Sequence, residues 1–118
     1  MQISLVGAGY WGSKLKAELQ TIPGVNEIEI IDIKDGKDLK DIKYHNVILA
    51  TPAWDHHTQT IKLLQQDKNV YVEKPLALSV SDGEIISDAA KSAGVTLMVG
   101  HLLQYHPVFV KIREMVIN

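Results

Sequence analysis

Short apolar runs of strand length alternate along the chain with longer stretches in which apolar residues recur at helical spacing. The apolar runs cover residues 2–6, 27–31, 47–50, 70–73 and 95–99. Glycine, proline or polar residues flank each run, which is typical of short buried strands. The pattern therefore predicts five strands.

The stretches between these runs predict helices. Apolar residues recur three and four positions apart in four stretches: residues 11–22, 54–66, 80–93 and 108–117. This is the spacing of one face of an α-helix. Ser79 is a preferred N-cap for the third helix, and Gly94 is a preferred residue after its end. Residues 34–45 are highly charged and lack such a stripe, so we expect only a short helix or turn there.

Strands that alternate with helices predict an α/β fold, in which a parallel sheet is covered on both faces and its crossovers are right-handed. We expect a Rossmann-type doubly wound sheet with the strand order 3-2-1-4-5. The length of 118 residues fits a single domain, residues 1–118.

The composition of the chain argues against several classes of function. The chain has no cysteine, which excludes disulfides, thiolate catalysis and thiolate metal sites. Its formal net charge of −2 disfavours nucleic acid as a partner. No apolar run approaches the roughly 18 residues of a membrane span, and the N-terminus lacks the pattern of a signal peptide. We therefore expect a cytoplasmic protein that does not bind a membrane.

A glycine-rich turn follows the first predicted strand and opens the first predicted helix: Gly7-Ala8-Gly9-Tyr10-Trp11-Gly12. This context is typical of a dinucleotide-binding turn. Gly7 would allow the tight turn, Gly9 would let the backbone approach a pyrophosphate, and Gly12 would permit close packing of helix on strand. The helix N-terminus would offer unpaired N–H groups to the phosphates, so Tyr10 and Trp11 are also expected at the cofactor. The alternative is a turn that binds nothing.

Asp32 ends the second predicted strand, 20 positions after Gly12. An acid at this place accepts hydrogen bonds from the adenosine ribose hydroxyls and repels a 2′-phosphate. The prediction is therefore NAD rather than NADP. Lys34 is a cation two residues further on and could attract that phosphate, and Asp32 could alternatively be a solvated loop acid.

Three further strand ends carry polar motifs: Ala50-Thr51-Pro52 with His56 after it, Glu73-Lys74-Pro75-Leu76-Ala77, and Gly100-His101. Together with the glycine turn, these motifs resemble the N-terminal half of the glucose–fructose oxidoreductase / inositol dehydrogenase (Gfo/Idh/MocA) family. The run from Gly100 to Pro107 further resembles members that oxidise nucleotide-linked N-acetyl sugars. All of the motifs lie at carboxyl ends of strands, where ligands bind in doubly wound sheets.

The resemblance implies roles for three of these residues. Lys74 would lie near the nicotinamide ribose and the substrate hydroxyl, orient both and assist proton transfer. Glu73 would position Lys74 or contact the ribose. His101 would lie near the nicotinamide face, so Lys74 and His101 are the candidate catalytic residues. The alternatives are a solvated surface lysine and a core or cap histidine.

Thr51 and Pro52 would line the adenine–ribose side of the same groove, although a plain strand-ending turn is equally compatible with them. His56 and His57 are adjacent, so at most one can face the groove, and we assign His56 to the cofactor. We therefore predict no metal site at these two histidines.

The resemblance also implies a second, α+β domain that carries most substrate contacts, and this chain stops at Asn118, in the helix that would lead into it. We therefore expect the cofactor half of an NAD-dependent oxidoreductase that acts on a sugar, nucleotide-sugar or cyclitol hydroxyl, with little turnover by this chain alone. The alternatives are a stand-alone nucleotide-binding module and an interaction protein that has lost the nucleotide.

The last predicted helix has more apolar residues than one buried stripe needs: Val108, Phe109, Val110, Ile112, Met115, Val116 and Ile117. An exposed patch of this kind typically marks an interaction site. We expect a two-fold homodimer through this helix. The alternative is a frayed C-terminus.

Overall fold

A computed structural model of the protein describes residues 1–117. Its strands are β1 (Gln2–Val6), β2 (Glu27–Ile31), β3 (Asn46–Leu49), β4 (Asn69–Val72) and β5 (Leu97–Val99). Within the described residues these five strands form one sheet, and every pair of neighbours is parallel. The α/β class and the five parallel strands predicted from the sequence are thereby confirmed.

The predicted strand order 3-2-1-4-5 is wrong, because the observed order is β2-β1-β3-β4-β5. The segment after β2 forms two short 3₁₀ turns, η1 (Ile33–Asp35) and η2 (Leu39–Asp41), rather than a crossover helix. Asp32 and Asp38 cap these turns by accepting from the next-but-one backbone N–H. In the described part of the chain, no strand therefore pairs with the outer edge of β2. The next strand, β3, pairs instead with the free edge of β1.

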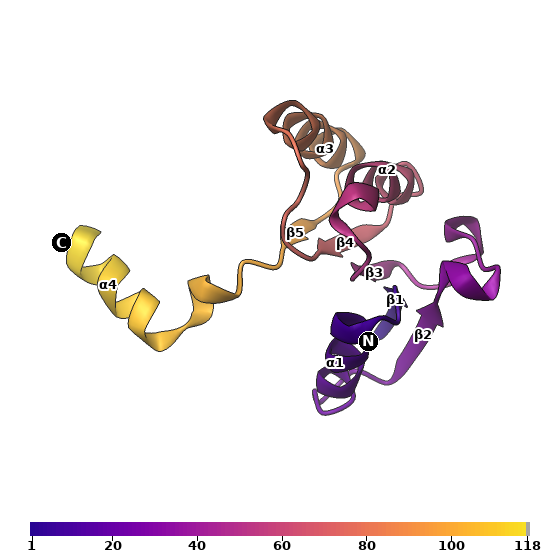
Figure 1. The fold of residues 1–118 in the computed structure, drawn as a ribbon, viewed down its shortest axis with the longest axis horizontal. Helices are drawn as coiled ribbons and strands as arrows, with labels where there is room; N and C mark the ends of the chain where they lie inside the picture. Colours follow the sequence, from indigo (N-terminus) through magenta and orange to yellow (C-terminus); the bar gives the residue numbers. More distant parts are fainter. Residues whose placement is uncertain (118) are drawn as a thin grey trace.

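Four helices pack around or extend from the sheet in the described residues: α1 (Tyr10–Leu19), α2 (Ala53–Leu64), α3 (Val80–Ala93) and α4 (Pro107–Ile117). Figure 1 shows α1 on one side of the sheet and the paired helices α2 and α3 on the other. Helix α3 begins at the predicted cap, where Ser79 Oγ accepts from the backbone N–H of Asp82, and it ends at Gly94 in the left-handed conformation.

The main core lies between the sheet and helices α2 and α3. Alternate residues of β4 show how it forms, since Val70 and Val72 are buried on this side and Tyr71 faces the other. On the helices, Leu63 and Ile86 are fully buried. Full burial of one such side chain stabilises a fold by about 1.5–3 kcal/mol. This core fixes the carboxyl ends of the neighbouring strands relative to one another.

Helix α4 differs from the other three because none of its described residues is buried. It packs against the 3₁₀ turn η3 (Leu102–Tyr105), and Figure 1 shows it pointing away from the sheet. Its apolar side chains, Met115 and Val116 among them, are exposed as the sequence predicted. Among residues 1–117, no helix is both long and apolar enough to cross a membrane.

Candidate functional site

A continuous groove follows the carboxyl ends of the strands. Its first cavity, of about 470 Å³, extends from the glycine turn to Asp32 and Thr51. A second cavity, of about 270 Å³, lies between Trp11, Thr51 and Lys74. A third, of about 500 Å³, extends from Lys74 to His101. Trp11 and Thr51 line both the first and second cavities, and Lys74 lines both the second and third, so the three form one strand-end groove.

The three glycines of the turn have different surroundings. Gly7 has a φ of +94°, and a Cβ there would lie 2.7 Å from the carbonyl oxygen of Ala50. A Cβ at Gly12 would overlap the carbonyl oxygen of Gly7, so helix α1 could not pack as closely on β1. At Gly9 a Cβ would meet nothing within 4 Å and would occupy the groove itself. Two glycines are therefore required by the fold, and the third leaves room for a ligand.

The N-terminus of α1 opens into the first cavity. Gly9 is its N-cap and offers no side-chain cap to the backbone N–H groups of the first turn, which also contains no acidic residue. Tyr10 is exposed, and the Lys14 ammonium lies 4.5 Å from the centre of its ring. Uncapped N–H groups at a helix N-terminus form a ready anion-binding site. The cradle at Gly9 therefore fits the pyrophosphate of a dinucleotide.

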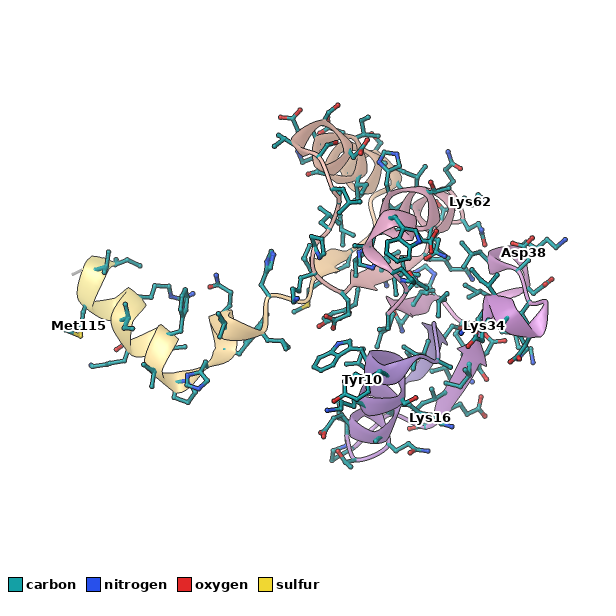
Figure 2. The ribbon with its side chains drawn as sticks, in the orientation of Figure 1. Tyr10, Lys16, Lys34, Asp38, Lys62 and Met115 are labelled. Atoms are coloured by element: carbon teal, nitrogen blue, oxygen red, sulfur yellow. The ribbon has the colours of Figure 1, made fainter. Side chains whose placement is uncertain are left out.

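Asp32 lies at the other end of the first cavity, beside Lys34. Its Oδ1 accepts from the backbone N–H of Lys34 at 3.0 Å. Within the described residues this is the one hydrogen bond of the carboxylate, which leaves its second oxygen for a ligand. Figure 2 shows Lys34 in the turn that follows β2. Of the residues predicted for the dinucleotide, seven line this cavity: Gly7, Gly9, Tyr10, Trp11, Asp32, Thr51 and Pro52.

Thr51 follows the end of β3 and lines both the first and the second cavity, with Pro52 beside it on the wall of the first. Its hydroxyl donates to Oε1 of Gln59 at 2.5 Å. Its carbonyl oxygen lies 2.9 Å from Nε2 of His56. Both partners are buried on α2, so helix α2 holds this turn from behind.

His56 does not line the groove as we expected. Its side chain is 1% exposed, and its Nδ1 lies 2.6 Å from the carbonyl oxygen of Pro75. The ring therefore lies behind the groove, between two backbone carbonyl groups. His57 faces α3, where its Nδ1 lies 3.1 Å from Asp82 Oδ1.

Glu73 lies in the second cavity next to Lys74, although it is only 6% exposed. Its Oε1 accepts from the Tyr71 hydroxyl at 3.1 Å. Burial, followed by the neighbouring Glu73 carboxylate, raises the pKa of Tyr71 to about 12. A Cβ at Gly100 would lie 2.5 Å from that hydroxyl, so a larger residue there would have to displace the Tyr71 side chain.

Lys74 and His101 meet at the third cavity. Both are exposed, and the Lys74–Pro75 peptide bond is cis. The other lining residues are mainly apolar: Leu102, Leu103 and Phe109, with Gly100 and the amide of Gln104. The structure therefore brings the two predicted catalytic residues to the same end of the groove.

Three residues at the site were not predicted from the sequence. Asp55 lines the first cavity, Gln59 holds Thr51, and Tyr71 bonds Glu73. The spacing could have indicated two of them. Gln59 follows His56 by one helical turn, and Tyr71 precedes Glu73 by two strand residues, so each pair shares a face.

Comparisons with known proteins identify the family of the chain. Residues 16–101 match the family model of the Gfo/Idh/MocA oxidoreductases, described as an NAD-binding Rossmann fold. A 4-carboxy-2-hydroxymuconate-6-semialdehyde dehydrogenase of Sphingobium sp. strain SYK-6 is 33% identical over 91% of this chain and 40% of its own length. An NAD⁺-dependent scyllo-inositol 2-dehydrogenase of Bacillus subtilis strain 168 is 34% identical over 60% of this chain and 21% of its own length.

Among solved structures, GenD2 from gentamicin A biosynthesis, in complex with NAD, superposes with a TM-score of 0.84 and 28% identity. The match covers 98% of this chain and 38% of GenD2, so the chain spans about two fifths of the length of such relatives. Fold, groove and family model agree. The chain belongs to the Gfo/Idh/MocA oxidoreductase family, of which it forms an NAD-binding Rossmann domain.

Proposed function

We propose that this chain is the cofactor half of a dehydrogenase that oxidises a hydroxyl of a sugar, nucleotide-linked sugar or cyclitol. The observation that carries the proposal is the continuity of the groove, which extends from Asp32 past Thr51 to Lys74 and His101. A dinucleotide at the Asp32 end would extend toward Lys74. The same groove offers a further cavity beyond Lys74 for a second molecule.

The residues of the first cavity would hold NAD by three kinds of contact. Backbone N–H groups after Gly9 would bind the pyrophosphate, and the free oxygen of Asp32 would accept from the adenosine ribose hydroxyls. Because that carboxylate repels a 2′-phosphate, we assign NAD as the preferred cofactor. Lys34 lines the same cavity and offers a cation to the 2′-phosphate of NADP. It follows Asp32 by two residues, so the carboxylate comes first at the end of β2.

The far end of the groove would carry the chemistry. Bound NAD⁺ supplies a nicotinamide C4 that accepts a hydride from a carbinol carbon. Lys74 would orient the substrate hydroxyl and assist removal of its proton, and Glu73 would keep the lysine in place. His101 would lie beside the reacting groups across the third cavity. The names of relatives such as scyllo-inositol 2-dehydrogenase support a polyol as substrate.

We expect this chain alone to bind the cofactor with little turnover, because both Lys74 and His101 are exposed in it. The matched relatives are more than twice as long, so further contacts to the substrate can come from another domain or chain. We also propose that α4 mediates a two-fold dimer, since its apolar side chains are exposed.

Calorimetric titration with NADH and NADPH, followed by a search for NADH formation with polyols, tests this function. We expect NADH to bind more tightly than NADPH. Binding of neither nucleotide would favour an interaction protein. Binding without turnover, even with the remaining domain of a relative added, would favour a stand-alone nucleotide-binding module. Efficient oxidation by the chain alone would show that the exposed end of the groove is already sufficient.

A further inference from the structure

Two turns that line the groove lie just beyond the ends of β3 and β4, where the hydrogen bonds of the sheet stop. The Thr51 turn, residues 50–52, follows β3, and the Lys74 turn, residues 73–76, follows β4. The last ladder bond between these strands is donated by the backbone N–H of Glu73 to the carbonyl oxygen of Leu49, at 3.0 Å. Beyond it, the two turns diverge from the sheet, and their separation depends on other contacts.

His56 provides the next contact between the two turns. Its Nε2 lies 2.9 Å from the Thr51 carbonyl oxygen and its Nδ1 lies 2.6 Å from that of Pro75. Carbonyl oxygens only accept, so both contacts are hydrogen bonds when both ring nitrogens carry a hydrogen. We propose that His56 is a positioning residue that sets the distance between the Thr51 turn and the Lys74 turn. This inference rests on the proposed role of Lys74.

The two turns are not equally dependent on this ring. Thr51 is also tied to α2 by its hydroxyl, which donates to Gln59. The Lys74 turn is tied to α2 through the Pro75 carbonyl group and His56. The Glu73 end of the Lys74 turn is also held, by the Tyr71 hydroxyl. Loss of the ring should therefore loosen the Pro75 end of the Lys74 turn more than it loosens the Thr51 turn.

This asymmetry has a consequence for the ligand. The first cavity, which would take the adenosine diphosphate part of a dinucleotide, depends on the glycine turn, Asp32 and Thr51. The second cavity, which adjoins Lys74, depends on the separation of the two turns. His56 should consequently matter for a ligand that reaches Lys74 and much less for one that ends at the pyrophosphate.

A comparison of NADH with ADP-ribose, which lacks the nicotinamide, tests the inference. His56→Gln is the informative variant, because one carboxamide cannot donate in two opposite directions. His57→Gln is the matched control on the same helix, since His57 contacts Asp82 and lines none of the three cavities.

We expect His56→Gln to weaken NADH binding about tenfold, the effect of losing about one well-placed hydrogen bond. ADP-ribose binding should change less than about twofold, and His57→Gln should change neither. Equal losses for both ligands would mean that His56 only stabilises the fold, and no loss for NADH would also overturn the inference. A wild-type chain that binds neither ligand would instead contradict the proposed function.

A measurement on the wild-type chain does not depend on the folding of a variant. Nitrogen NMR of the His56 ring should show an N–H group that is protected from exchange with solvent, because the ring lies against the carbonyl groups of both turns. A ring with no protected N–H group would bond neither turn and would overturn the inference.

Discussion

The two ends of the strand-end groove are built in different ways. At the Asp32 end, the walls are the ends of β1, β2 and β3, and backbone atoms approach so closely that Gly7 and Gly12 leave no room for a Cβ. At the His101 end, the walls include exposed side chains of η3 and the half-buried Phe109 of α4, and no described residue of α4 is fully buried. The sheet itself therefore organises the Asp32 end of the groove, whereas the His101 end depends on contacts outside the sheet.

The largest expected effect is at the glycine turn. Gly12→Ala should destabilise the chain by more than about 3 kcal/mol, because the new methyl group overlaps a backbone carbonyl group that cannot move without shifting β1. Denaturant unfolding followed by tryptophan fluorescence measures this loss.

Gly9→Ala is the matched control for that experiment. Its methyl group meets nothing within 4 Å, so unfolding should be nearly unchanged. NADH binding should nevertheless weaken by about tenfold or more, because the methyl group occupies the cradle. A Gly9→Ala chain that binds NADH normally would show that the pyrophosphate does not lie there.

At Asp32, a smaller and more selective effect is expected. Asp32→Asn keeps an oxygen that can cap η1 but removes the charge. NADH affinity should fall about five- to tenfold, and the ratio of NADH to NADPH affinity should move toward NADPH. Calorimetry with both nucleotides measures the ratio of affinities. An unchanged ratio would show that Asp32 does not discriminate between NADH and NADPH.

A substitution on helix α4 tests the opposite end of the groove. Figure 2 shows Met115 on this helix, far from the sheet, and the residue is 71% exposed. Met115→Glu should weaken self-association about fivefold and leave NADH affinity unchanged. Sedimentation at several concentrations measures this, with Lys91→Glu on α3 as the control. A wild-type chain that remains monomeric at tens of micromolar would end the dimer proposal.

The smallest effect concerns the Tyr71–Glu73 pair. The Tyr71 pKa of about 12 lies above its ordinary value of 10.0. The unfolded chain therefore ionises first, and the free energy of unfolding should fall as the pH rises from 10 toward 12. Ultraviolet titration of wild type against Tyr71→Phe measures the pKa.

Glu73→Gln separates the two causes of that shift. It should lower the pKa of Tyr71 but keep it above the ordinary value, because burial is the larger cause. A full return to the ordinary value would mean that the carboxylate alone perturbs the tyrosine.

The sequence predicted what depends on local spacing. The five strands, the helix caps and the glycine turn all follow from residues within a few positions of one another. The strand order was missed because it depends on where the chain goes after Asp32, and two capped turns there have little apolar pattern.

The orientation of His56 was missed for a related reason. Two adjacent histidines on one helix cannot be told apart without knowing how α2 is rotated against the sheet. The contact between His56 and Pro75 joins residues 19 positions apart. Such pairing is set by tertiary packing, not by local spacing, and the same is true of the fit between Gly100 and Tyr71.

The backbone N–H of Lys34 that holds Asp32 Oδ1 has an entropic consequence. A carboxylate free to rotate loses rotamer freedom when it binds a ligand, which costs about 0.5–1.5 kcal/mol per ordered side chain. Asp32 is already held in one orientation by the turn that it caps. The folding of β2 and η1 therefore orders the side chain that we propose for the ribose before any nucleotide arrives, and less of the contact energy is spent on ordering it.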